Sequence, residues 1–438
     1  MPHPVSAHGH RYATPRRAAL ASACVIGVTL ATAMPLCAQQ AAPVTPAQVD
    51  SLRQRVEDAE AALQALREQL STEASSALRT RSRVSLEFTG RALMHLVRND
   101  GRTNNVDVPT FARADSGNGP QGGLAMTIRQ TTLGLAFQAT EVLGGTFTGD
   151  LDVDFFGGQQ PSSGGRTFPL VRLRTARAQL GWTHGFVLAG QEQPLITGLD
   201  PVSLASVGTP GFAGAGNLWL WLPQLRAGVH TAGRVRVGLE GAVLAPTSGD
   251  PAAGFDTQFD PAERTGTPFV QGAVRLEWGE EERRGTVTVG LHHGEVLDGA
   301  DATHDSKAVA VSARVPLGAR LELRGEWYEG QLVRGLGGGA VGQAFGTGGA
   351  PVRTAAHWLQ ANVQAAPRIL LGAGWGVDLP KAIDLPPARE RNAVTEAHVH
   401  WRPAGPLVLG LEWRSLATRY AAGTATTQHL NLAVGFEF

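Results

Sequence analysis

Apolar and polar positions alternate with a period of two along the larger part of the chain, from residue 82 to residue 438. In one run, Val84, Leu86 and Phe88 alternate with Ser85 and Glu87. Successive side chains of a β-strand point to opposite faces, so each such run predicts a strand with one apolar face and one polar or small face.

Sixteen runs of this kind follow one another. They lie at 82–97, 124–138, 143–156, 167–182, 186–191, 218–228, 233–245, 267–278, 284–294, 304–315, 319–330, 354–364, 368–378, 391–402, 405–416 and 424–438. Short turns alternate with longer loops rich in Gly, Pro and Asp. The long loops lie at 98–123, 192–217, 246–266, 331–353 and 379–390. An even strand number with all long loops at one end is typical of an outer-membrane barrel.

The last run distinguishes this barrel from a soluble β-sandwich, in which single strands would show the same alternation. Its apolar positions are Leu430, Leu432, Val434, Phe436 and Phe438. In water such a strand would leave an unpaired edge, whereas in lipid every edge must close. We therefore expect an all-β fold: a 16-stranded antiparallel transmembrane β-barrel occupying 82–438, whose final strand pairs with its first. Tryptophans at or near strand ends suit an interfacial girdle; they are Trp182, Trp278, Trp327, Trp401 and Trp413.

The first 38 residues are typical of a secretory signal peptide. A segment with three arginines precedes the apolar stretch 18–36. We expect cleavage after Ala38, with a lipoprotein cut at Cys37 or an uncleaved anchor as alternatives. Cleavage would remove three positive charges and leave a net charge of −3.

The segment 39–81 is predicted to form a short α-helical coiled coil in the periplasm. Its apolar residues are spaced alternately three and four apart, as in the seam of a coiled coil; they are Val49, Leu52, Val56, Ala59, Leu63, Leu66 and Leu70. Such a short helix is marginal alone and implies an oligomer. An amphipathic helix lying on its own chain is the alternative.

Composition narrows the function classes. The 438 residues are 42% apolar and 17% charged, with 55 glycines, 26 prolines and a formal net charge of +0. These values argue against a helical membrane protein, a collagen and a nucleic-acid binder. Both cysteines, Cys24 and Cys37, precede the expected cleavage site, which excludes thiol chemistry in the mature chain.

No cofactor and no enzymatic activity are expected. Glu396, His398 and His400 share one strand face, but residues two apart on a strand lie nearly 7 Å apart, which suits solvated side chains better than a metal site. A nucleophile elbow and a phosphate-binding loop are absent from the sequence. A hydrolase embedded in the barrel is therefore unsupported.

About sixteen strands leave an aqueous channel unless a loop or domain folds inside, so passive diffusion is the default function. The loop 192–217 either folds inward and narrows the pore or is a mobile external loop. The arginines predicted to face the lumen are Arg172, Arg174, Arg234, Arg236, Arg275, Arg314 and Arg324. The acids predicted there are Asp150, Asp152, Asp154, Glu322, Glu326, Glu396, Glu412 and Glu437. Segregated charges would select charged solutes. Alternatively, Asp150 and Asp152 simply neutralise Arg172 and Arg174 in the neighbouring strand.

Six short motifs, in this order, resemble the DcaP-like trimeric outer-membrane porins. They are Leu86-Glu-Phe-Thr-Gly90, Arg129-Gln-Thr-Thr-Leu-Gly134, Leu151-Asp-Val-Asp-Phe-Phe-Gly157, Val171-Arg-Leu-Arg-Thr-Ala176, Val187-Leu-Ala-Gly-Gln191 and Leu222-Pro-Gln-Leu-Arg226. The resemblance implies a homotrimer of 16-stranded barrels in outer-membrane lipid that takes up small anionic solutes such as dicarboxylates. Thr132 and Arg177 depart from the family pattern.

The resemblance places Arg129, Arg172, Arg174 and Arg226 at basic positions of the constriction. Together with Arg236, Asp150 and Asp152, they are the candidate residues for lining the pore and binding substrate; a metal site is not expected. The predicted function is an outer-membrane porin for small anionic or polar solutes, with no nucleic-acid partner. The alternative is a tethering barrel whose coiled coil binds the cell wall or another partner.

Overall fold

A computed structural model of the chain describes residues 54, 78–79, 84–114, 117, 121–157, 169–249, 258–280, 283–339, 343–346, 349–381 and 389–438. The expected signal peptide (1–38) lies outside the described residues. Of the expected coiled coil (39–81), only three residues are described. Those boundaries stay predictions. Among the described residues, no helix combines the length and apolar character needed to cross a bilayer.

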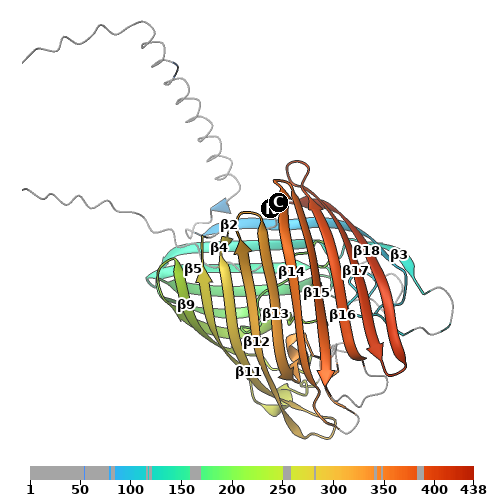
Figure 1. The fold of residues 1–438 in the computed structure, drawn as a ribbon. Helices are drawn as coiled ribbons and strands as arrows, with labels where there is room; N and C mark the ends of the chain where they lie inside the picture. Colours follow the sequence, from blue (N-terminus) through green and yellow to red (C-terminus); the bar gives the residue numbers. More distant parts are fainter. Residues whose placement is uncertain are drawn as a thin grey trace, which may run out of the picture. The chain divides into compact units, whose positions relative to one another are not determined.

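The described part of the chain is almost entirely β-structure (Figure 1). The strands are β1 (Leu78–Arg79), β2 (Ser85–Asn99), β3 (Gly123–Thr127), β4 (Thr132–Val142), β5 (Gly145–Asp154), β6 (Arg172–Trp182), β7 (Gly185–Glu192), β8 (Leu222–His230), β9 (Val235–Leu244), β10 (Phe269–Trp278), β11 (Gly285–Leu297), β12 (Thr303–Leu317), β13 (Leu321–Gln331), β14 (Arg353–Ala366), β15 (Ile369–Lys381), β16 (Arg389–Trp401), β17 (Leu407–Tyr420) and β18 (Gly423–Glu437). Two short 3-10 helices, η2 (Glu263–Thr265) and η4 (Val333–Leu336), lie in loops.

From β2 to β18 the strands form a closed antiparallel barrel. β18 pairs with β2 from His429 opposite Asn99 to Glu437 opposite Arg91, so the last strand closes on the first as predicted. β3 and β4 both pair with β2 and are two halves of one interrupted strand. Counted in this way, the barrel wall has sixteen strands, which confirms the predicted number.

The interruption between β3 and β4 differs from the single strand predicted over 124–138. A turn closes there with a hydrogen bond from the Thr131 nitrogen to the Ile128 oxygen, 3.0 Å long. Arg129 and Gln130 within this turn are 1% and 0% exposed. Strand pairing is therefore interrupted at this turn, and the long polar side chains of Arg129 and Gln130 lie in the barrel interior.

The connections have the predicted asymmetry. At one end, which we call the short-turn end, hairpins are closed by segments such as 143–144, 183–184 and 367–368. At the other, the long-loop end, the connections include 100–122 and 193–221. The long loops were predicted at the correct end of the barrel. The chain reverses direction at each strand, so every second connection lies at the same end.

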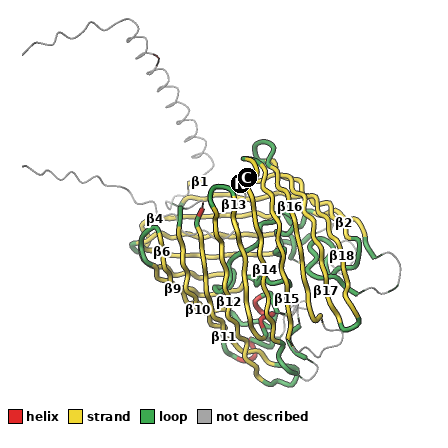
Figure 2. The backbone as a smooth tube through the Cα atoms, viewed as in Figure 1, coloured by secondary structure: helices red, strands yellow, loops and turns green. Residues whose placement is uncertain are grey.

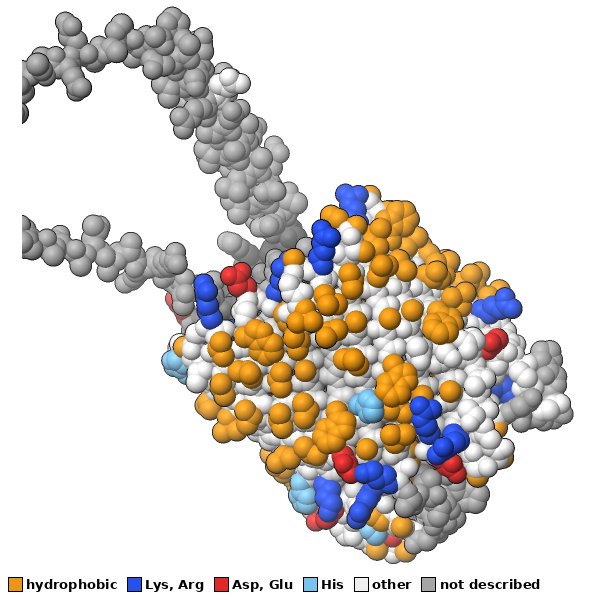
Figure 3. Space-filling model, viewed as in Figure 1, with side chains coloured by type: hydrophobic (Ala, Val, Ile, Leu, Met, Phe, Trp, Pro, Cys, Tyr) orange, Lys and Arg blue, Asp and Glu red, His pale blue; other side chains and the backbone are white. Residues whose placement is uncertain are grey.

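The apolar face of each strand points away from the lumen. On β18, Leu430, Leu432 and Phe436 are 44%, 39% and 45% exposed, whereas the intervening Asn431 and Ala433 are at most 1% exposed. Figure 3 shows hydrophobic side chains spread across the outer face of the strands. A soluble monomer rarely exposes an apolar area of this extent, so this face requires a non-aqueous environment.

Loops from the long-loop end fold into the barrel (Figure 2). Tyr420 donates a hydrogen bond to the Ala112 oxygen (2.7 Å), and the Ala112 nitrogen donates to Thr418 (2.9 Å), so the loop 100–122 lies against β17. The loop carrying η4 meets the loop 193–221, where the Trp219 nitrogen donates to the Leu336 oxygen at 3.0 Å.

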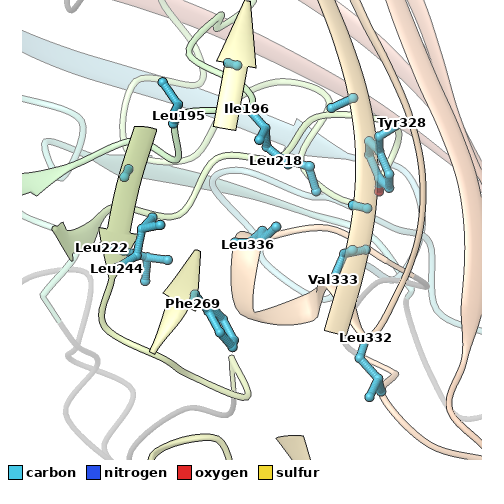
Figure 4. Packing of buried hydrophobic residues seen from close by; sticks show 14 of the residues in the cluster. Leu195, Ile196, Leu218, Leu222, Leu244, Phe269, Tyr328, Leu332, Val333 and Leu336 are labelled. Atoms are coloured by element: carbon cyan, nitrogen blue, oxygen red, sulfur yellow. The ribbon is translucent and has the colours of Figure 1, made fainter. Parts of the chain in front are cut away.

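Where these two loops meet, an apolar cluster lies against the wall formed by β8 to β14 (Figure 4). Its largest buried members are Leu195, Ile196, Leu218, Leu244, Phe269 and Tyr328. Burial of these side chains gives the loops a hydrophobic attachment to the wall.

Candidate functional site: the lumen and its internal loop

The loop 193–221, between β7 and β8, crosses the lumen to the opposite wall. Its backbone is held by side chains of β13, β14 and β17. The Val202 nitrogen donates to Gln360 (2.8 Å), and Gln360 donates back to the Val202 oxygen (2.9 Å). Of the two alternatives for this loop, the structure shows the inward one. Its chain occupies part of the lumen cross-section.

Two carboxylates anchor the loop. Glu326 on β13 accepts hydrogen bonds from the Leu218 nitrogen and the Asn217 amide, both 3.0 Å long. Glu412 on β17 accepts bonds from three consecutive residues, 203–205: the Ser203 hydroxyl (2.8 Å) and the backbone nitrogens of the next two residues (2.5 and 2.8 Å). Buried donors need such partners. These acids face the lumen, as predicted, and there they accept hydrogen bonds from N–H groups of the loop.

A close backbone approach completes the docking of the loop. Gly216 has a φ of +111°, and a Cβ atom there would lie 2.3 Å from the carbonyl carbon of His357 on β14. A side chain at this position is excluded by both the conformation and the contact. The glycine thus lets the loop lie directly on the strand.

On the opposite side, the loop meets an arginine cluster formed by β5 and β6. Arg172 makes a two-point contact with Asp154, through Nε (3.0 Å) and Nη2 (2.6 Å), and also donates to the loop oxygen of Gly208. Arg174 lies with its Nε 3.7 Å from the same carboxylate. Both guanidinium groups lie over the Trp221 ring, 5.1 and 5.0 Å from its centroid. Two cations therefore share one carboxylate and one aromatic face.

In the alternative left open by the sequence, Asp150 and Asp152 neutralise Arg172 and Arg174; in the structure Asp154 pairs with both arginines instead. A bulge between Asp152 and Val153 shifts the register, so that Asp154 lies opposite Arg172. Asp150 instead bonds Arg177 (2.5 Å), and Asp152 accepts a bond from the Thr175 hydroxyl (3.1 Å). A bulge adds one residue to one strand and re-aims its side chains, which alternation alone does not reveal.

Arg129 lies at the inner end of the same cluster. Its Nε and Nη2 lie 2.8 and 2.6 Å from Asp107 of the loop 100–122, and its guanidinium lies 4.2 Å from the Phe156 ring centroid. The side chain is only 2% exposed. Arg129 thus joins the loop 100–122 to the wall, and in this conformation its charge is enclosed rather than presented to water.

The other candidate residues lie apart from this cluster. Arg226 on β8 donates to the Gln193 oxygen (2.8 Å) at the start of the inward loop. Arg236 on β9 lies near the short-turn end, 3.8 Å from Glu277. The structure therefore groups Arg129, Arg172 and Arg174 and leaves the remaining candidates along the lumen wall.

Four lumen carboxylates each serve two arginines. Asp154 pairs with Arg172 and Arg174, Glu437 with Arg91 and Arg402, Glu322 with Arg314 and Arg324, and Glu277 with Arg236 and Arg284. Each cluster therefore carries one excess positive charge. Two sites are reversed, because Arg177 is shared by Asp150 and Glu192, and Arg414 by Glu396 and Glu412. Glu277 and Glu192 were not among the predicted acids.

Asp200, in the inward loop, has a different environment from these paired acids. Burial raises its pKa, while the nearby Arg174 acts in the opposite direction. Its carboxylate accepts a bond from Gln193 (2.8 Å), and its backbone oxygen accepts one from Arg324 (2.9 Å). This carboxyl group holds its proton more readily than an exposed aspartate and adds less negative charge to the lumen.

The face considered for metal binding is part of the loop attachment. The rings of His398 and His400 stack with centroids 4.4 Å apart, and His400 Nε2 lies 3.2 Å from Glu412. Within the described ranges, no group of three or more His, Cys, Asp or Glu residues could hold a metal ion.

The fold has counterparts among solved structures, although no family model and no curated protein match the sequence. The outer-membrane channel DcaP of Acinetobacter baumannii superposes with a TM-score of 0.62 at 15% identity, covering 83% of this chain and all of that one. The chain has the porin fold. An anion-selective porin from Comamonas acidovorans gives 0.52 at 14% identity, covering 81% and 100% of the two chains. OprB of Pseudomonas putida gives 0.51 at 10%, covering 81% and 94%.

Proposed function

We propose that this chain is an outer-membrane porin: a passive diffusion channel for small anionic organic solutes of the dicarboxylate type. The proposal depends on one combination of features. A closed barrel with an apolar outer face encloses a lumen in which four carboxylates each lie near two arginines. A porin needs both features, a lipid-compatible wall and a polar, charged path through it.

The outer face supports the membrane location. Its large apolar side chains are exposed on strand after strand, and the tryptophans Trp401 and Trp413 are 47% and 41% exposed among them. Burying one such side chain is worth about 1.5–3 kcal/mol, so insertion in lipid offsets a large exposure cost in water. Barrels of this type with short turns at one end and long loops at the other reside in the bacterial outer membrane. A cleaved signal peptide would deliver the chain there.

The distribution of lumen charge supports an anion preference. The acids Glu326, Glu396 and Glu412 at the loop wall are at most 3% exposed and are engaged by the loop or by Arg414. By contrast, the side chains of Arg172 and Arg236 are each 25% exposed. The most exposed ion-paired lumen acids, Asp150 and Glu277, are 21% and 19% exposed, so the most exposed charges of these pairs are slightly in favour of cations. The Comamonas porin of the same fold is described as anion-selective.

The arginine cluster beside the loop is suited to a carboxylate. A guanidinium binds a carboxylate with two parallel hydrogen bonds, and Arg172 already binds Asp154 in this way. A solute carboxylate can compete with Asp154 for the two guanidinium groups of Arg172 and Arg174. A second carboxylate of the same solute would meet another lumen arginine, which favours dicarboxylates over monocarboxylates.

We infer in addition that three copies assemble, with the segment 39–81 as a periplasmic coiled coil. The support is the heptad spacing of its apolar residues. The pore-lining assignment extends to Arg226, Arg236, Asp150 and Asp152, whereas the enclosed Arg129 would hold Asp107 of the loop 100–122 in place.

Reversal potentials in a salt gradient across a planar bilayer test the anion preference. The wild type should give a potential of the sign set by the anion, and Arg172→Ala/Arg174→Ala should move it toward zero. Arg320→Ala, in an exposed turn, is the control and should leave it unchanged. An anion preference that is absent, or that survives the double change, would overturn the proposed arginine filter.

A further inference from the structure

Four outward-facing basic residues lie side by side at the long-loop end of the barrel. Arg353, Lys381, Arg391 and Arg419 come from β14, β15, β16 and β17, which are consecutive in the wall. We call them the basic band. Figure 3 shows Lys and Arg side chains gathered at the lower end of this face, below its hydrophobic surface.

Within the basic band, like charges face each other across neighbouring strands. Arg353 lies directly opposite Lys381, and Arg391 lies directly opposite Arg419. Directly opposed residues have Cβ atoms about 4.5–5.5 Å apart, and like charges at this spacing destabilise a sheet. This arrangement occurs twice, on neighbouring strand pairs. Such a repulsion indicates that a negative charge near the basic residues compensates it.

The protein itself supplies only part of that charge. Lys381 pairs with Glu329, and Arg419 lies 3.1 Å from Glu390. Arg353 contacts the neutral amide of Gln331 (3.2 Å). Among the described residues, Arg391 has no acidic partner. Among the residues that the structure describes, two cations of the basic band, Arg353 and Arg391, thus lack a carboxylate partner.

The basic band borders the apolar belt. Leu379, 37% exposed, directly follows the last β15–β16 pair, in which Asp378 lies opposite Asn392, the neighbour of Arg391. Outward residues between Trp413 and Arg419 are the small Ser415 and Ala417. A guanidinium at the edge of an apolar belt lies at the depth of lipid headgroups, and the small residues leave room beside it.

The opposite end of the same strands lacks this arrangement. Arg320 and Arg368 lie in turns, and Arg368 donates to the Pro403 oxygen at 2.5 Å. Arg402 is held by Glu437 at 2.9 Å. Basic residues there are separated or paired, so the two ends of the barrel differ in more than their loop lengths.

We propose that the basic band binds the phosphate-bearing headgroup of an anionic lipid in the leaflet on the long-loop side. This inference rests on the proposed membrane location but goes beyond the channel function. Phosphate oxygens bridge the opposed cations and remove their repulsion, while the lipid chains lie on the adjoining apolar belt. The occupant is a lipid because the basic band is continuous with that belt.

The test uses the full-length protein in neutral detergent. Bisphosphorylated lipid A, its dephosphorylated form and inorganic phosphate are each titrated while retained lipid is counted by native mass spectrometry. The variant Arg391→Gln/Arg419→Gln removes one opposed pair, Arg391→Lys/Arg419→Lys keeps its charge, and Arg320→Gln/Arg368→Gln is matched for charge at the other end.

We expect the bisphosphorylated lipid to bind the wild type and the Lys variant. The Gln variant should bind it about 30-fold more weakly, from about 1 kcal/mol for each basic residue at an anionic surface. The short-turn variant should bind as the wild type does. Equal binding of the dephosphorylated lipid, an equal loss in the short-turn variant, or equivalent occupancy by inorganic phosphate would each overturn the proposal. Ion conductance of the same samples separates failure of this proposal from failure of the channel function.

Discussion

Removing the Glu412 carboxylate should release the inward loop without opening the barrel. Glu412 accepts hydrogen bonds from Ser203 and the two following backbone nitrogens, at 2.5–2.8 Å. Hydrogen bonds to a charged group are worth about 1.5–3 kcal/mol each, so Glu412→Ala weakens docking of this segment by several kcal/mol. The wall itself keeps its strand pairing on both sides of β17.

Single-channel recording in planar bilayers measures the consequence. Glu412→Ala should give a higher and noisier conductance, because segment 203–205 leaves the wall and moves in the lumen. Glu412→Gln retains one acceptor oxygen and should be intermediate. Glu437→Ala is the matched control: this lumen acid contacts Arg91 and Arg402 but not the loop. Unchanged conductance and noise in a folded Glu412→Ala barrel would refute the anchoring role.

Four further changes test other parts of the structure. Asp154→Asn leaves Arg172 and Arg174 without their shared acid and should increase the anion preference in reversal-potential measurements; a decrease would contradict the cluster's assigned charge. Arg177→Ala leaves Asp150 and Glu192 uncompensated and should lower that preference more than Arg275→Ala, which frees only Glu240; equal shifts would show that shared acids do not matter. Gly216→Ala places a Cβ against His357 in a left-handed conformation that costs about 1–2 kcal/mol, and should raise channel noise, whereas Gly198→Ala, with its nearest contact at 4.0 Å, should not. Deleting residues 39–80 should convert trimers to monomers in light scattering with conductance per barrel retained; trimers that persist would show that the barrel walls suffice for assembly.

Strand number and facing could be predicted from the sequence because they depend on local alternation. The side-chain period of two holds for every residue of a strand regardless of its neighbours, so Leu430 and Leu432 point outward in the structure as the pattern indicated. The pairing of β18 with β2 followed from the requirement that no edge stay open in lipid. These features needed no knowledge of distant contacts.

The partners of the lumen charges could not be predicted in the same way. The pairing of Asp154 with Arg172 depends on one bulge, which moves the register between two strands. Alternation assigns Glu326 and Glu412 to the lumen but does not distinguish an acid in water from one that binds a loop. Their roles arise from contacts across more than 100 positions of the chain, between the loop 193–221 and the far wall. The buried Gln130, which accepts a bond from the Val207 nitrogen (2.7 Å), is a further loop contact with no sequence signal.

Bi-ionic measurements in a planar bilayer show whether dicarboxylates cross the barrel by passive diffusion. One side of the bilayer contains chloride and the other a small dicarboxylate, with the same large impermeant cation on both sides. Under these conditions the folded wild-type protein should carry a steady dicarboxylate current. Absence of current from a correctly folded barrel would rule out passive diffusion of dicarboxylates. A current carried mainly by small cations, when these replace the impermeant one, would rule out the anion preference.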